Sequence, residues 1–229
     1  MTTIAFDPST LTVADLACRR GGRAVFTGLS LALSPGRPVW LKGPNGVGKS
    51  SLLRLLAGLG DPQSGQICWD GVAVTDDPEG FASLRHFLGH AEALKPAMSL
   101  AGNTAFHARL QGVSPAAVPQ RVALALDALK IGGLADLPAR VLSSGQRRRA
   151  ALARLLLTDR PLWLLDEPTV GLDAAARDDL ASLIRTHARR GGLALIASHE
   201  ALDPDMAVVE MTPPLDPLAS ILSDEAWPV

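Results

Sequence analysis

The run GPNGVGKS at residues 43–50 constrains the fold of this chain more than any other stretch of its sequence. It fits the pattern G-x-x-x-x-G-K-[ST] at every fixed position. An apolar stretch at 39–41 precedes it, and from Lys49 onward leucines follow the i, i+3, i+4, i+7 spacing of a buried helix face. A strand, a glycine-rich turn and a helix in this order create a loop whose backbone N–H groups can surround phosphate.

Two side chains of this loop have the chemistry that a bound triphosphate requires. We expect Lys49 to neutralise the β- and γ-phosphates and the Ser50 hydroxyl to ligate Mg²⁺. A chance glycine turn before a helix is the alternative, and the flanking strand and helix patterns argue against it. The predicted nucleotide-binding residues of the loop are Gly43, Pro44, Asn45, Gly46, Val47, Gly48, Lys49, Ser50 and Ser51.

The other segments predict an α/β fold with a helical insert. Alternating apolar residues predict strands at 11–18 and 29–33, and short strands at 65–71 and 86–89 around a polar excursion at 75–80. Apolar runs at 162–165 and 193–197 alternate with helical segments, one of them running from Gly145 through Leu157, which indicates parallel strands covered on both faces. Amphipathic stretches at 100–110 and 118–129 predict the insert, and 203–229, with five prolines, predicts a tail around one strand at 207–211.

Composition limits the partners of the chain. Its 229 residues carry a net charge of −1, so no global positive field favours nucleic acid, and we expect the arginines at 147–149 to form a solvated helix face. No apolar stretch approaches the ~20 residues that span a bilayer, and the first residues lack a secretory pattern. Cys18 and Cys68 form no metal or haem motif, which favours free thiols in a reducing cytoplasm.

Two carboxylates end the apolar strand at 162–165. In parallel sheets ligands gather at the carboxyl ends of strands, so Asp166 can hold Mg²⁺, and Glu167 can polarise the attacking water. Taken alone, such a pair is often a solvated strand end; the phosphate loop is what favours the catalytic interpretation.

A third motif, LSSGQ at 142–146, precedes a basic helix. By itself it predicts a helix N-terminus capped by Ser143, with free N–H groups that form a second anion site. Together with the phosphate loop and the strand-end carboxylates it makes the chain resemble the ATP-binding cassette (ABC) family, whose signature reads LSGGQ.

The resemblance implies a P-loop NTPase cassette with a mostly parallel core sheet, an antiparallel β-subdomain and an inserted α-helical subdomain. It implies one ATPase domain over 1–203, with a RecA-like lobe at about 11–90 and 158–203, a helical subdomain at about 91–157, and a C-terminal tail at 204–229. ATP and Mg²⁺ are the implied cofactors. ATP hydrolysis would use Lys49, Glu167 and the switch histidine, His199.

The family pairs two cassettes head to tail, so the resemblance also implies a homodimer. The signature residues of one subunit would cap the γ-phosphate held by the loop of the other, and Asp173 would bridge the two sites. These signature residues are Ser143, Ser144, Gly145 and Gln146.

Three positions depart from the family pattern. His90 stands where the family has a glutamine that touches Mg²⁺ and faces the membrane subunit, so we expect a coupling role and a metal contact that requires neutral imidazole; a buried structural histidine is the alternative. Arg20 stands where an aromatic residue stacks on adenine, which predicts weak base selectivity. Ser144 replaces a glycine, which is tolerable if its φ is negative.

Within the family the chain is most similar to the ATPase subunits of the bacterial cytochrome c maturation system. This similarity rests on Gly89-His90 followed by Leu94-Lys95, on Arg20, and on SGQRRR at 144–149. It implies a peripheral ATPase at the cytoplasmic face of the inner membrane, bound to separate integral membrane permease subunits and concerned with haem only indirectly.

Other functions remain open at this point. The chain could serve another exporter, or it could be a soluble ABC ATPase of translation or DNA repair. Those soluble ATPases resemble tandem cassettes or cassettes split by a coiled coil, and here one phosphate loop occurs. A nucleotide sensor without turnover is a further alternative, against which Glu167 and His199 argue.

Overall fold

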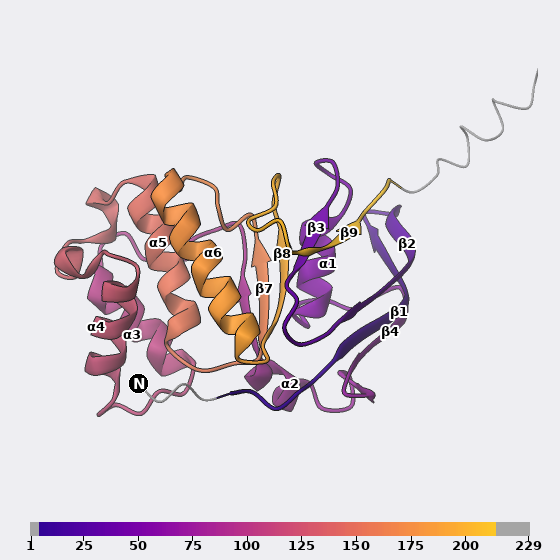
Figure 1. Ribbon diagram of the computed structural model, residues 1–229, viewed down its shortest axis with the longest axis horizontal. Helices are drawn as coiled ribbons and strands as arrows, with labels where there is room; N and C mark the ends of the chain where they lie inside the picture. The colour runs from indigo at the N-terminus through magenta and orange to yellow at the C-terminus, as the bar shows by residue number, and fades with distance from the viewer. Residues whose placement is uncertain (1–4, 214–229) are drawn as a thin grey trace, which may run out of the picture.

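Two sheets and a helical lobe make up the computed structural model, which describes residues 5–213 (Figure 1). The core sheet has the strand order β6-β7-β8-β3-β9, and every pairing in it is parallel. Its strands are β6 Arg85–Leu88, β7 Leu162–Asp166, β8 Leu193–Ala197, β3 Val39–Lys42 and β9 Ala207–Glu210. Apolar β7 and β8 are buried along their whole length, which confirms a parallel sheet covered on both faces.

An antiparallel sheet of order β2-β1-β4-β5 packs beside the core sheet. Its strands are β1 Leu11–Arg20, β2 Arg23–Leu33, β4 Ser64–Trp69 and β5 Val72–Ala73. The helix α1, Lys49–Leu56, places its leucines against the apolar faces of both sheets, in one core with alternate residues of β7 and β8. The opposite face of the core sheet packs against α6, Ala174–Arg189.

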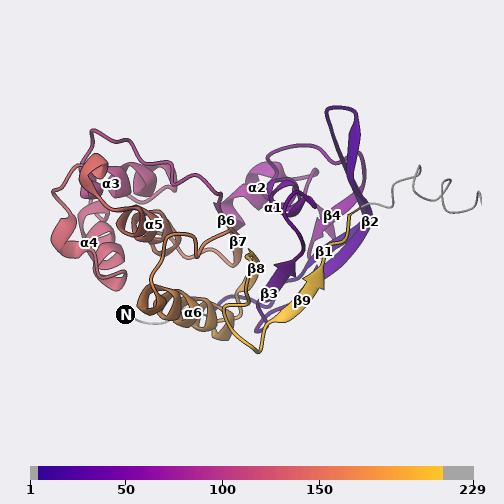
Figure 2. The ribbon, with the colours of Figure 1, turned by 90° about the horizontal axis from the view of Figure 1, so that it is seen from above.

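The helical lobe lies at the far end of the molecule from the antiparallel sheet (Figure 2). It contains α3 Leu100–Leu110, α4 Val118–Ala128, η1 Gly132–Leu134, η2 Ala139–Val141, α5 Ser144–Ala153 and η3 Arg154–Leu156. Its apolar residues share one core with α6 and with the other faces of β7 and β8. The lobe is therefore attached to the core sheet by buried apolar contacts, which position α5 next to the carboxyl end of β7.

The structure differs from the sequence prediction in several elements, of which three bear on the layout of the core sheet and helices. A helix, α2 Pro78–Leu84, forms within the expected polar excursion, because Asp77 caps it and Pro78 occupies its first turn. The helix α5 ends at Ala153 and continues as the 3₁₀ turn η3, short of Leu157. The strand predicted in the tail is β9, and it pairs with β3 as an edge of the core sheet, so the sheet extends past residue 203.

Candidate nucleotide-binding site

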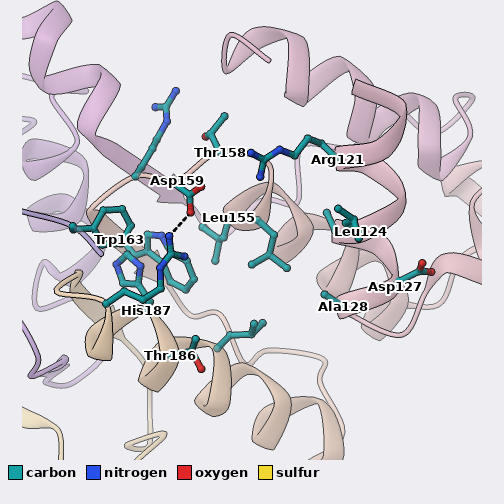
Figure 3. Close-up of a pocket in the computed structure, with 16 residues that line it drawn as sticks. Arg121, Leu124, Asp127, Ala128, Leu155, Thr158, Asp159, Trp163, Thr186 and His187 are labelled. Atoms are coloured by element: carbon teal, nitrogen blue, oxygen red, sulfur yellow. Dashed lines mark hydrogen bonds and ion pairs between the residues drawn. The ribbon is translucent and has the colours of Figure 1, made fainter. Parts of the chain in front are cut away.

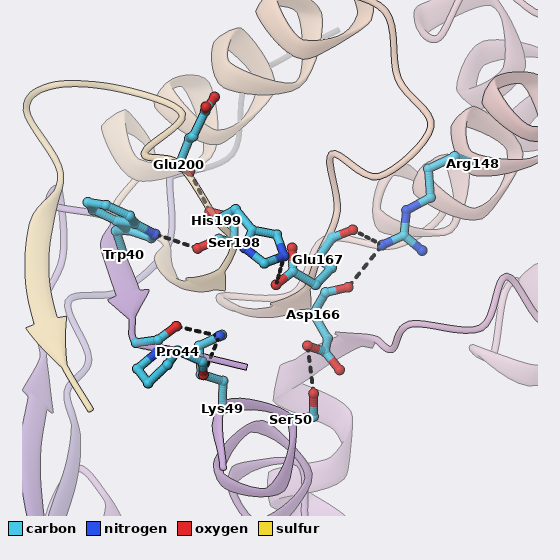
Figure 4. A network of polar contacts seen from close by, with 11 residues as sticks. Trp40, Pro44, Lys49, Ser50, Arg148, Asp166, Glu167, Ser198, His199 and Glu200 are labelled. Carbon is cyan, nitrogen blue, oxygen red and sulfur yellow. Dashed lines mark hydrogen bonds and ion pairs between the residues drawn. The ribbon is translucent and has the colours of Figure 1, made fainter. Parts of the chain in front are cut away.

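The phosphate loop connects β3 to α1, as its flanking patterns predict. Gly43 and Gly48 have φ of 156° and 111°, and an added Cβ would lie 2.7 Å from the Met211 carbonyl oxygen and 2.7 Å from Val25, respectively. Lys49 is 7% exposed and donates to the carbonyl oxygens of Gly43, at 2.7 Å, and Pro44, at 3.2 Å (Figure 4). The loop thus curls around the ammonium group, which puts a positive charge where phosphates are expected.

Ser50 and Asp166 meet across the gap between α1 and β7. The Ser50 hydroxyl donates to Oδ1 of Asp166 at 3.0 Å, and Asp166 is 4% exposed (Figure 4). Mg²⁺ at nucleotide sites takes one or two protein oxygens and fills its shell with phosphate oxygens and water, so this hydroxyl–carboxylate pair fits the ion. Across residues 5–213 no group of three or more His, Cys, Asp or Glu residues could hold a metal by itself.

Glu167 has an unusual backbone conformation. Its φ is 49°, in the left-handed region that residues other than glycine adopt at a cost of roughly 1–3 kcal/mol. Its amide donates to the Ala197 carbonyl oxygen at 2.8 Å, and its Oε2 is buried without a hydrogen-bond partner among the described residues. The other oxygen, Oε1, faces His199, and a carboxylate at this position can act as the base toward a bound water.

His199 follows β8 and faces Glu167. Its Nε2 lies 3.8 Å from Oε1 of Glu167, too far for a direct hydrogen bond, and its side chain is 63% exposed (Figure 4). The preceding residue, Ser198, is fixed by two contacts: its carbonyl oxygen accepts from Nε1 of Trp40 at 2.9 Å, and its hydroxyl donates to the Glu200 carbonyl oxygen at 2.6 Å. The backbone is anchored while the imidazole remains accessible.

The signature residues begin α5. Ser143 and Gln146 form a capping box, in which the Gln146 amide donates to the Ser143 hydroxyl and the Ser143 amide donates to the Gln146 side chain. Ser144 is the first helical residue and is not among the residues with positive φ, as its substitution for glycine requires. Gly145 packs closely against the turn before α6: an added Cβ would lie 2.8 Å from the Gly171 carbonyl oxygen.

Asp173 caps α6 next to the signature. Its Oδ1 accepts from the Ala176 amide at 2.8 Å and pairs with Arg149 at 3.0 Å. The Ala176 hydrogen bond, followed by Arg149, lowers the pKa of Asp173 below its ordinary value. A cavity of about 440 Å³ opens here, lined by Ser143, Ser144, Gly145, Gln146, Arg149 and Asp173 among others. The signature therefore borders this cavity with the N-terminus of α5, and the guanidinium of Arg149 lies beside it.

Arg20 and His90 occupy exposed positions at two margins of the site. Arg20 is the last residue of β1 and pairs with Arg23 of β2. Arg23 is two residues before Val25, whose side chain lies beside Gly48 of the phosphate loop. His90 follows β6, and its exposed side chain rules out the buried structural histidine considered above. Neither its metal contact nor its coupling role is tested by the structure, so both remain predictions.

One residue of the site escaped the sequence prediction. The sequence predicts Arg148 on a solvated helix face, yet it is 3% exposed and donates to the backbone carbonyl oxygens of Asp166 and Glu167 (Figure 4). The available signal was its spacing from Ala151, Leu152 and Leu155, which places it on the buried face of α5.

A larger cavity of about 560 Å³ lies away from the phosphate loop, between α4, α6 and the start of β7 (Figure 3). His187 lines it, stacked on Trp163 at 4.0 Å between ring centroids, and Arg190 pairs there with Asp159 at 2.6 Å. Its lining contains neither the phosphate loop nor the carboxylates that end β7, so we exclude it from the nucleotide site.

Comparison with known proteins identifies the family. The ABC transporter family model matches residues 26–170, which is more than half of the chain. The chain belongs to the ABC transporter family. A putative ABC transporter ATP-binding protein from Pyrococcus furiosus has the same fold, with a TM-score of 0.76 and 25% identity over 88% of this chain and 97% of that chain.

Several relatives of this ABC protein share one name. The cytochrome c biogenesis ATP-binding export protein CcmA of Rhodospirillum rubrum is 48% identical over 186 residues, which cover 81% of this chain and 78% of the relative. The protein of that name from Paramagnetospirillum magneticum is 46% identical over 191 residues, covering 83% and 88%. The expected resemblance and fold class are therefore confirmed: this is an ABC cassette of the CcmA type. In the described part of the chain no helix has the length and apolarity to cross a membrane.

Proposed function

We propose that this cassette is the ATP-hydrolysing subunit of an ABC export complex that serves cytochrome c biogenesis. One observation carries the catalytic part of the proposal: the carboxyl ends of β3, β7 and β8 bring Lys49, Asp166 and His199 to one edge of the core sheet, with Ser50 and Glu167 beside them. The names of the relatives support the biological part.

Phosphate binding, metal binding and proton transfer are assigned to different residues of the site. The loop amides and Lys49 bind the phosphates, and Ser50 with Asp166 would hold Mg²⁺, which supplies charge neutralisation at the β- and γ-oxygens when bound. Glu167 accepts a proton from the attacking water. His199 then orients Glu167 and contacts the γ-phosphate once nucleotide is present.

The position of the signature supports a homodimer. Ser143 and Ser144 are exposed beside their own cavity at the start of α5 and have no contact with the phosphate loop that the structure shows. A second copy, turned head to tail, could place its triphosphate against these helix N–H groups. Two clefts would then form, each completed by both subunits, with Asp173 between them.

The cassette would work at the cytoplasmic face of the inner membrane, as a peripheral subunit bound to separate permease chains. Closure of the dimer on ATP would pull on these permeases and hydrolysis would reset them. Any haem would be handled by the membrane partners. Service to another exporter is the alternative, and membrane co-purification distinguishes the two by the identity of the partner chains.

The catalytic proposal is tested with Glu167→Gln. This variant keeps the shape of the side chain but cannot accept the proton, so hydrolysis should fall by roughly 10²-fold or more while ATP still binds. Light scattering should then detect a dimer in MgATP and a monomer without nucleotide. Glu79→Gln, an exposed carboxylate on α2, is the matched control and should leave turnover unchanged. Normal turnover in Glu167→Gln would remove Glu167 from the role.

A further inference from the structure

The Arg148 guanidinium is saturated by backbone oxygens from two loops. Nε donates to the Pro168 carbonyl oxygen at 3.2 Å, and Nη2 donates to those of Asp166, at 2.9 Å, and Glu167, at 2.6 Å. Nη1 donates to the carbonyl oxygens of Gly89 and His90, both at 3.3 Å. An arginine has five N–H donors in a fixed plane, and here each has an acceptor.

These two loops leave neighbouring strands of the core sheet. β6 and β7 pair in parallel with Leu88 opposite Leu165, so 89–90 and 166–168 emerge side by side at the same sheet edge. Arg148 reaches both from the second turn of α5, the helix that begins with the signature. A single side chain thus connects three segments: the signature helix, the segment of Glu167 and the loop of His90.

The segment of Glu167 needs such a support. The left-handed φ of Glu167 persists only if its surroundings hold it, and Arg148 binds the carbonyl oxygens of 166, 167 and 168 in succession. The carboxylate direction follows from this backbone conformation. A displacement of about 1 Å at a catalytic group can cost on the order of 10²-fold in rate, so a small release of this backbone would be measurable.

We propose that Arg148 is a positioning residue that couples the 89–90 loop to Glu167, so that movement of the loop changes the rate of hydrolysis. The rate effect rests on the proposed role of Glu167, whereas the mechanical link between the two loops does not. A burial-only role is the competing explanation. It predicts loss of stability without a selective effect on the two loops.

The kinetic test uses Arg148→Lys, which keeps the charge but supplies three donors without the planar fork. We expect kcat to fall roughly 10- to 100-fold while KM for ATP changes less than about twofold, because the phosphate loop is untouched. Arg154→Lys is the control: Arg154 begins η3, directly after the same helix, and donates to the Ala151 carbonyl oxygen. Its kcat should stay within about twofold of the parent value.

Amide hydrogen exchange tests the link itself. Arg148→Lys should raise exchange in both 88–92 and 166–170, and Arg154→Lys in neither. Faster exchange in 166–170 alone would overturn the coupling, as would unchanged exchange in both. If exchange rises in both segments but Glu167→Gln retains turnover, the link stands and the proposed catalytic role fails.

A variant in the 89–90 loop tests the same link while Arg148 is intact, so this test does not require that an Arg148 variant folds. An added Cβ at Gly89 would lie 3.3 Å from the Phe87 ring, so Gly89→Val should displace the loop slightly. We expect this variant to raise exchange in 166–170 and to lower kcat when Arg148 is present. In the Arg148→Lys background, adding Gly89→Val should change kcat and exchange in 166–170 less than it does in the parent. A change of the same size in both backgrounds would show that the effect of Gly89→Val does not pass through Arg148, and would overturn the proposal.

Discussion

At the scale of single residues, two buried histidines have environments that oppose protonation. Burial lowers the pKa of His86 to about 4, and its ring contacts the Thr158 carbonyl oxygen at 3.1 Å. Burial also lowers the pKa of His187, the cavity-lining histidine labelled in Figure 3, to about 4. Its Nε2 lies 3.1 Å from the Pro161 carbonyl oxygen. Both imidazoles are therefore neutral at pH 7.

This predicts a loss of stability in mild acid. The folded pKa of about 4 lies below the unfolded value near 6.5, so between these values the unfolded chain binds more protons. Stability from each neutral histidine is complete above about pH 6.5 and is lost as pH falls toward 4, with a loss of about 2 kcal/mol each near pH 5. Urea unfolding at neutral and mildly acidic pH measures the free energy of unfolding at each pH. His187→Gln should reduce the slope of this free energy against pH. An unchanged slope would contradict the assignment.

Residue roles were predictable where the chemistry is local in sequence. Lys49 and Ser50 follow from one motif, and Asp166 and Glu167 follow from the end of an apolar strand. Arg148 was not predictable in the same way, because its carbonyl partners come from two loops that only the β6–β7 pairing brings together. The exposure of His90 depends likewise on how its loop leaves the sheet.

At the scale of elements, periodicity predicted the apolar strands β7 and β8 and the helices α3 and α4, because each has a strong pattern of its own. It missed α2, whose helix is short and begins at Asp77-Pro78, a sequence that suits both a turn and a helix start. It also left β9 in a tail. The pairing of that strand with β3 is a long-range contact with no local signature.

The packing of α5 against the turn before α6 makes a second prediction. In Gly145→Ala the new Cβ would lie 2.8 Å from the Gly171 carbonyl oxygen, so the signature must move away from that turn. We expect a loss of roughly 1 kcal/mol in stability and about tenfold in hydrolysis. Gly133→Ala is the control, since its Cβ would have no neighbour within 4 Å. Equal activity in the two variants would show that the signature position is not critical.

At the scale of the whole molecule, the phosphate loop and the signature lie at two separate places. The phosphate loop and its carboxylates lie at the edge of the core sheet, while the signature borders a separate cavity on the helical lobe. In residues 5–213 of one copy, the lining of the signature cavity includes no residue of the phosphate loop. The sequence could indicate the proposed dimer only through family resemblance, because the contacts of one copy with another have no pattern in a single sequence.

His90 allows a prediction at this scale. It is exposed on the loop that Arg148 holds, outside the phosphate loop. We expect His90→Gln to keep ATP affinity within about twofold and to change the ATPase rate of the complex with its membrane partners. Turnover in membranes with and without those partners provides the measurement. A partner-stimulated rate identical to that of the parent would remove His90 from coupling.

The contacts of Arg148 have one more consequence. All five acceptors are backbone carbonyl oxygens. These hydrogen bonds therefore depend on the backbone conformation of the two loops and not on the side chains that the loops carry. A substitution of the side chain at position 90 therefore leaves all five of these acceptors in place, and the contact between this loop and the segment of Glu167 does not depend on which residue stands there.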